Sequence, residues 1–215
     1  GPLTTELAIQ WAKQSQNCPL SWARRLDIVR RFARYMKVLF PETQIPQEGL
    51  FGSSHRRPSP HIYSEEEIAA IMRTASNLTP INSLRPHTYM TLFGLLASSG
   101  MRISEALQLS RKDLDFAAGT ITIVKTKYHK SRIIPLHSTT IVALKSYIDK
   151  CDKKYPILKT NALFINEQGT PLRYRRVLLT FRQIVFTLGW RKKSGDRGPR
   201  IHDIRHYFTV FRLLQ

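Results

Sequence analysis

The sequence predicts a mainly α-helical fold with one small β-hairpin, an α+β chain built in two parts. Apolar residues recur at helical spacing along most of the 215 residues, whereas residues 119–136 alternate between apolar and polar in the manner of strands. A segment rich in proline, glycine and serine, residues 46–62, separates the first helices from the remainder. Because 42% of the residues are apolar, the chain can build a core, which excludes a disordered basic tail.

The first part of the chain is expected to be a small helical unit. Residues 4–16 and 20–40 both repeat apolar side chains every three or four positions, and arginines fill much of the second segment between them. Prolines then end the helical pattern. We expect a partial helical domain over residues 1–45, a linker over 46–62 and a larger domain over 63–215.

The sequence predicts where the first helix of the larger domain begins. Ser64 is followed by three glutamates, and Ser64 and Glu67 have the spacing of a capping box. A second helix over residues 86–98 is apolar nearly all round, so it is expected to be central to the core. Gly100 breaks that helix, and a third helix is expected over residues 104–109.

A β-hairpin is expected next, with strands over residues 119–127 and 131–136 that are joined through Tyr128, His129 and Lys130. The remaining chain returns to helical spacing, with one short apolar segment and one loop. The expected helices are residues 138–150, 173–188 and 201–214, the apolar segment is 162–165, and the loop is 195–199.

The charge of the chain indicates a polyanionic partner. There are 34 lysines and arginines against 15 aspartates and glutamates, a formal net charge of +19, and the excess is greatest in residues 173–215. Nucleic acid is the first candidate and an acidic membrane surface the second. The two cysteines, Cys18 and Cys151, lack metal-ligand or redox-motif spacing and suit a reducing interior.

Three short motifs carry side chains that suit a phosphate. Arg102 stands at a helix start after Gly100, where a guanidinium and backbone N–H groups face the same way. The hairpin places four basic side chains between residues 125 and 132. His202 and Arg205 lie three residues apart on one helical face. Each motif alone also fits a solvated surface, and only their combination and order favour a functional site.

The ordered set Gly100-Met101-Arg102-Ile103-Ser104-Glu105, the basic hairpin and His202-Asp203-Ile204-Arg205-His206 resembles the tyrosine recombinase (phage integrase) family. Thr126 and Tyr128 replace glycines of that family's hairpin. The resemblance implies a helical core-binding domain before a catalytic domain. It also implies that Arg102 and Arg205 bind the scissile phosphate and that Lys127 protonates the leaving 5′-hydroxyl. His202 is implied to move a proton or bind phosphate, and Glu105 is implied to orient the site. No metal or cofactor is implied.

The resemblance further implies a second histidine and a tyrosine nucleophile after the His-x-x-Arg helix, and we expect the sequence to be truncated before both. It predicts a site-specific recombinase or integrase core that acts on double-stranded DNA, with self-association on DNA as a dimer or tetramer. We expect a cytoplasmic, mobile-element or nucleoid-associated bacterial protein. A non-catalytic DNA-binding accessory protein of the same descent is the alternative, and a metal-dependent nuclease is disfavoured because the sequence has no carboxylate cluster. The expected DNA contacts are Lys125, Lys130, Arg132, Arg173, Arg175, Arg176, Arg191, Lys192 and Lys193.

Overall fold

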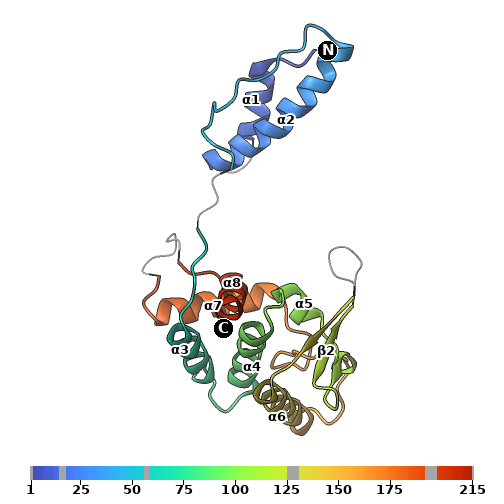
Figure 1. Cartoon of the computed structure of the whole chain (residues 1–215), viewed down its shortest axis with the longest axis vertical. Coiled ribbons are helices and arrows are strands. Elements are labelled where there is room, and N and C mark those ends of the chain that lie inside the picture. The colour runs from blue at the N-terminus through green and yellow to red at the C-terminus, as the bar shows by residue number, and fades with distance from the viewer. Residues whose placement is uncertain (1, 15–17, 56–58, 125–130, 192–197, 215) are drawn as a thin grey trace. The chain divides into compact units, whose positions relative to one another are not determined.

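The computed structural model describes residues 2–14, 18–55, 59–124, 131–191 and 198–214. The chain divides into two compact units, residues 1–59 and 60–215, which are considered separately (Figure 1). None of the helices in the described ranges is long and apolar enough to cross a membrane. Whether the first unit is a partial core-binding domain stays a prediction.

The first unit is a pair of helices, α1 (Thr5–Lys13) and α2 (Pro19–Leu39), which pack through Ala8, Ala12 and Leu26. The segment after α2 is held by a buried arginine of that helix. Arg30 donates from Nε to the carbonyl of Pro46 and from Nη2 to the carbonyl of Gln47, each over 2.9 Å. These bonds satisfy two backbone acceptors of a proline-rich segment that forms no helix or strand of its own.

The second unit is mainly helical. Its helix α4 is central and contacts α3, α6 and α8, as Figure 1 shows. Helix α4 is buried on most sides, through Leu92, Phe93, Leu95 and Leu96 among others, which confirms the prediction from its apolar sequence. The helices of this unit are α3 (Glu65–Ser76), α4 (Leu84–Ser99), α5 (Ile103–Gln108), α6 (Ser138–Lys154), α7 (Tyr174–Thr187) and α8 (Asp203–Leu213).

A three-stranded antiparallel sheet lies beside these helices in the order β1 (Leu114–Asp115), β2 (Thr120–Ile123) and β3 (Arg132–Pro135). Strands β2 and β3 pair in the register Ile121 to Ile134, so the expected pairing is confirmed. Both strands are shorter than the predicted 119–127 and 131–136, and the connection through Tyr128, His129 and Lys130 lies outside the described residues. Strand β1 was not expected, because two residues are too short for an alternating pattern to be recognised. A 3₁₀ turn, η1 (Arg111–Asp113), leads into it.

The predicted helix starts and stops in this unit have the expected physical basis. The Ser64 hydroxyl accepts from the Glu67 backbone N–H (3.2 Å), and the Glu67 carboxylate accepts from the Ser64 N–H (2.9 Å), which completes the capping box. Helix α4 ends at Gly100 in the left-handed region (φ 60°). A Cβ atom there would lie 2.1 Å from the Phe208 ring, so glycine is required by both the backbone conformation and the close approach of α8.

Candidate active site and nucleic-acid interface

The turn between α4 and α5 presents Arg102 and fixes it with Glu105. Arg102 is the N-cap residue of α5, and the Glu105 carboxylate accepts a hydrogen bond from its backbone N–H (2.7 Å) and another from its Nη1 (2.9 Å). Glu105 is only 8% exposed, whereas the Arg102 side chain is 39% exposed. The carboxylate is therefore the buried anchor, and the guanidinium is the group that remains accessible to a ligand.

Arg132, the first residue of β3, binds the same carboxylate through both terminal nitrogens of its guanidinium. Its Nη1 lies 3.2 Å from Oε1 of Glu105 and its Nη2 lies 2.8 Å from Oε2, a bidentate pair. Burial alone raises the pKa of the Glu105 carboxyl, but the hydrogen bonds from the Arg102 backbone, Arg132 and the Arg102 side chain outweigh burial and lower it. Glu105 is therefore ionised at neutral pH.

Helix α8 brings Arg205 to this turn. Its Nη1 donates to the carbonyl of Gly100 over 2.7 Å. Burial and the positive charge of Arg102 lower the pKa of the Arg205 guanidinium, Glu105 opposes this effect, and Arg132 adds to it. The positive charges of three guanidiniums therefore influence one another near a single carboxylate. These four side chains carry a net charge of +2. An excess of cations of this kind suits an oxyanion such as a phosphodiester.

His202 lies at the start of α8, and its ring stands edge-on to that of His206 at 5.5 Å between centroids. Partial burial and the charges of His206 and Arg205 lower the pKa of the His202 imidazole. The ring is therefore mostly neutral at pH 7 and able to accept a proton. Lys127, the remaining predicted catalytic residue, lies outside the described residues, as do Lys125, Lys130, Lys192 and Lys193.

Two residues that the sequence analysis did not single out hold the start of α8. Asp203 is 1% exposed and accepts from the backbone N–H of Arg200 (2.9 Å), from its Nε (3.2 Å) and from its Nη2 (2.8 Å). The Tyr63 hydroxyl donates to the Arg200 carbonyl over 3.2 Å. These bonds fix the loop that leads into the helix carrying His202 and Arg205. The His202-Asp203-Ile204-Arg205 motif gave no indication of this role, because Arg200, the partner of Asp203, precedes the motif.

The basic residues at the start of α7 form a second feature of the surface. Arg173, Arg175 and Arg176 are exposed, and Arg191, beyond the end of this helix, is half-buried. Arg173 and Arg176 line a hollow of about 640 Å³ together with Arg85 from the first turn of α4. Arg85 was not predicted as a site residue, because a single arginine at a helix start carries no distinguishing pattern in the sequence.

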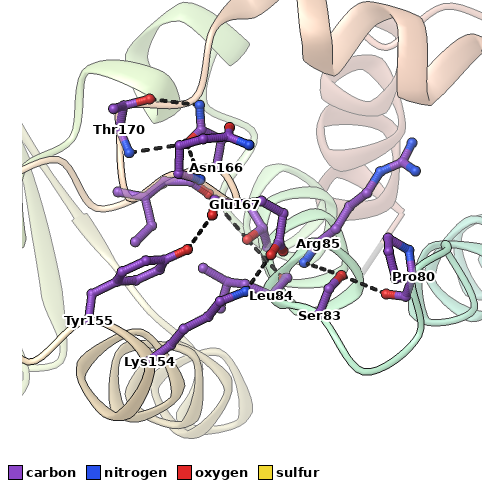
Figure 2. Close-up of polar contacts among 12 residues, drawn as sticks. Pro80, Ser83, Leu84, Arg85, Lys154, Tyr155, Asn166, Glu167 and Thr170 are labelled. Atoms are coloured by element: carbon purple, nitrogen blue, oxygen red, sulfur yellow. Dashed lines mark hydrogen bonds and ion pairs between the residues drawn. The ribbon is translucent and has the colours of Figure 1, made fainter.

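A polar network supports one side of this hollow (Figure 2). Lys154, at the end of α6, forms an ion pair with Glu167, and the adjacent Tyr155 hydroxyl donates to the Glu167 carbonyl. Asn166 accepts from the backbone N–H of Thr170 over 3.1 Å, which closes the turn. The network fixes the 166–170 turn, which lines the hollow beside the arginines.

In the part of the chain that the structure describes, no three histidine, cysteine, aspartate or glutamate side chains gather as metal ligands would. The arginines around Glu105 give this site a positive character instead, which suits an oxyanion.

Two solved structures with a similar fold are a site-specific recombinase and an integrase, each bound to DNA. XerH bound to its difH substrate in a post-cleavage complex aligns with 99% of this chain and 60% of its own (TM-score 0.68, 20% identity). A lambda integrase tetramer bound to a Holliday junction also aligns with 99% of this chain and 60% of its own (TM-score 0.69, 16% identity). The architecture is therefore that of the tyrosine recombinases.

Comparison with known sequences identifies the family to which this chain belongs. The Phage integrase family matches residues 62–214. The integrase/recombinase y4rB of Sinorhizobium fredii is 38% identical over 219 residues, which cover 99% of this chain and 69% of y4rB. Tyrosine recombinase XerC of Chlamydia trachomatis is 31% identical over 185 residues, or 85% of this chain and 55% of XerC. This chain belongs to the phage integrase family, and it spans between about half and two thirds of the length of these relatives.

Proposed function

We propose that this chain is the core of a site-specific DNA recombinase, which binds duplex DNA and activates one scissile phosphate for strand exchange. The observation that carries the proposal is the pairing of Arg102 and Arg132 with the buried carboxylate of Glu105, beside Arg205, which bonds to the carbonyl of Gly100 in the same turn. Three cations near one anion leave unbalanced positive charge beside an accessible guanidinium, an arrangement that suits a phosphodiester.

In this proposal Arg102 and Arg205 bind the two nonbridging oxygens of the phosphate. Negative charge on those oxygens grows as the phosphorus becomes pentacoordinate, so the two guanidiniums stabilise the transition state more than the ground state. Glu105 keeps the Arg102 side chain in place from within the protein. The bond from Arg205 to the Gly100 carbonyl, at 2.7 Å, leaves the other guanidinium nitrogens of Arg205 for the ligand.

In this proposal the chemical step uses the tyrosine nucleophile that the family resemblance implies. Its hydroxyl passes its proton to a base, a role that neutral His202 can fill, while its oxygen bonds to phosphorus and the bond from phosphorus to the 5′-oxygen breaks. Lys127 supplies the proton that the 5′-oxygen takes up, so the DNA is left with a 5′-hydroxyl and a 3′-phosphotyrosyl link. His202, neutral at pH 7, hydrogen-bonds the phosphate or moves a proton.

We propose that DNA also contacts Arg173, Arg175, Arg176 and Arg191, together with Lys125, Lys130, Lys192 and Lys193, four lysines that lie outside the described residues. Most of these residues are expected to contact phosphates rather than bases, because exposed arginines and lysines position DNA without reading its sequence. The first unit of the chain serves as a partial core-binding domain, and copies of the protein associate on DNA.

Two measurements test the proposal. The 215-residue chain should bind duplex DNA with an affinity that falls steeply as salt rises from about 50 to 200 mM. The protein encoded by the parent gene should form a covalent adduct with a nicked suicide substrate, and Arg102→Ala should abolish the adduct while much of the DNA binding remains. Binding that does not depend on salt would refute the proposal. Steep salt dependence without any adduct would favour the non-catalytic accessory protein instead.

A further inference from the structure

Arg132 is the least expected member of the arginine cluster. Its position in the basic hairpin suggests a contact with DNA, yet both terminal nitrogens of its guanidinium are directed at Glu105, at 3.2 and 2.8 Å. The same two carboxylate oxygens hold Arg102, Oε1 through the side chain and Oε2 through the backbone N–H. Glu105 therefore lies between Arg102, three residues before it, and Arg132, 27 residues after it.

Arg102 engages each oxygen of the Glu105 carboxylate once, and its side-chain bond comes from a guanidinium that is 39% exposed. The planar fork of Arg132 adds a second, bidentate partner and so further restricts the rotation of the carboxylate. Burial of Glu105 strengthens the constraint, since few water molecules can replace a lost partner at a side chain that is only 8% exposed. Arg132 is itself 35% exposed in its side chain, so its charge also reaches the surface of the site.

We infer that Arg132 is a positioning residue of the phosphate site, which acts on Arg102 through Glu105 and not as a ligand of the DNA backbone. This inference rests on the proposed function for its biological meaning, but the coupling between the two arginines is a property of the free protein. It assigns the first residue of β3 to the machinery that orients the catalytic arginine.

The first experiment asks whether Arg132 touches DNA. Duplex affinity of the 215-residue chain is measured against salt concentration for the wild type, Arg132→Ala and Arg176→Ala. Loss of one phosphate contact lowers the slope of log affinity against log salt by about 0.9. We expect that decrease for Arg176→Ala and an unchanged slope for Arg132→Ala. A decrease of about 0.9 for Arg132→Ala would make it a phosphate ligand and overturn the inference.

The second experiment asks whether Arg132 acts through Glu105. The Nε–Hε resonance of Arg102 and the carboxyl resonance of Glu105 are followed by NMR in the free chain. Arg132→Ala should shift the Arg102 resonance and raise the titration midpoint of Glu105. Arg132→Lys should restore part of both changes, because an ammonium supplies the charge without the fork. No shift at Arg102 in Arg132→Ala would overturn the inference.

The Glu105→Gln background provides the matched control. There the carboxylate that links the arginines is gone, so adding Arg132→Ala should leave the Arg102 resonance where Glu105→Gln puts it. An equally large shift in that background would show that Arg132 acts by another route, and the inference would be wrong. If instead the wild-type chain shows no salt-dependent DNA binding, the proposed function fails while the NMR result still decides the coupling.

Discussion

The guanidinium of Arg205 donates a 2.7 Å hydrogen bond to the backbone carbonyl of Gly100, a residue 105 positions earlier in the sequence. This bond joins the helix that carries Arg205 to the turn that carries Arg102. Since Gly100 also allows α8 to approach closely, the same turn supplies both an acceptor for Arg205 and the space for Phe208.

Replacement of Arg205 should reduce the rate of DNA cleavage. Arg205→Ala removes a phosphate ligand and one long-range hydrogen bond, and we expect adduct formation by the parent protein to fall about 10²- to 10³-fold, as for other lost oxyanion donors. Arg205→Lys should recover only part of this, because it lacks the planar fork. Single-turnover cleavage of a nicked substrate measures both variants. Undiminished cleavage by Arg205→Ala would contradict the assigned role.

Gly100→Ala should destabilise the second unit more than a positive φ alone explains. The left-handed conformation costs a non-glycine residue about 1–2 kcal/mol, and here the new Cβ would also meet the Phe208 ring at 2.1 Å. We expect a loss of about 3 kcal/mol in the free energy of unfolding, measured with urea. Gly189→Ala is the matched control, because Gly189 has a φ of 73° and open space around it. Equal losses for the two variants would show that contact with Phe208 is unimportant.

Glu105→Gln should lower stability in a manner that depends on pH. The folded-state pKa of Glu105 lies below its ordinary value of 4.5, so the stabilisation by its carboxylate is complete above about pH 4.5 and is lost as the pH falls through the lower folded-state value. At pH 7 the variant should lose about 3 kcal/mol, the usual scale for breaking a buried ion pair.

The difference between wild type and Glu105→Gln should therefore shrink as the pH is lowered from 7 towards 3, in urea unfolding at each pH. Glu65→Gln, at an exposed carboxylate in the first turn of α3, should change stability little throughout. If the loss in free energy of unfolding caused by Glu105→Gln is constant across this pH range, then lost packing, and not lost charge, is responsible.

The start of α7 should account for part of the salt dependence of DNA binding. If Arg173, Arg175 and Arg176 each contact a phosphate, their combined replacement by alanine should lower the salt slope by about 2.7, as three such contacts would. The control removes three charges from α6 instead, through Lys145, Lys150 and Lys153. These three lysines are exposed and none of them lines the hollow beside Arg173 and Arg176, so the control should leave the slope near that of the wild type. Equal slopes for both triple variants would place DNA elsewhere.

Much of this fold follows from local pattern. The capping box at Ser64, the buried helix before Gly100 and the β2–β3 hairpin were all predicted, because each depends on residues that are close in sequence. The contact of Glu105 with Arg102 is local as well, at a separation of three residues.

The long-range contacts of the site were not predictable in the same way. Nothing in the sequence around Arg132 indicates that its guanidinium reaches Glu105 rather than solvent, and the bond of Arg205 to a backbone carbonyl has no side-chain signature. The burial of Asp203 under Arg200 and the place of Arg85 beside the arginines of α7 likewise depend on how helices pack. Such contacts are set by tertiary structure, which the pattern of one segment does not contain.

The arginine cluster draws on residues 102–105, 132 and 205, which has a consequence for the order of events in synthesis. Arg102 and Glu105 leave the ribosome roughly one hundred residues before Arg205, an interval of about 5 to 20 s at typical rates of translation. During that interval Glu105, Arg102 and Arg132 have been synthesised, but Arg205 and the helix that carries it have not. The complete cluster therefore forms only after α8 has been made, so a nascent chain that lacks α8 cannot present the full set of charges to DNA.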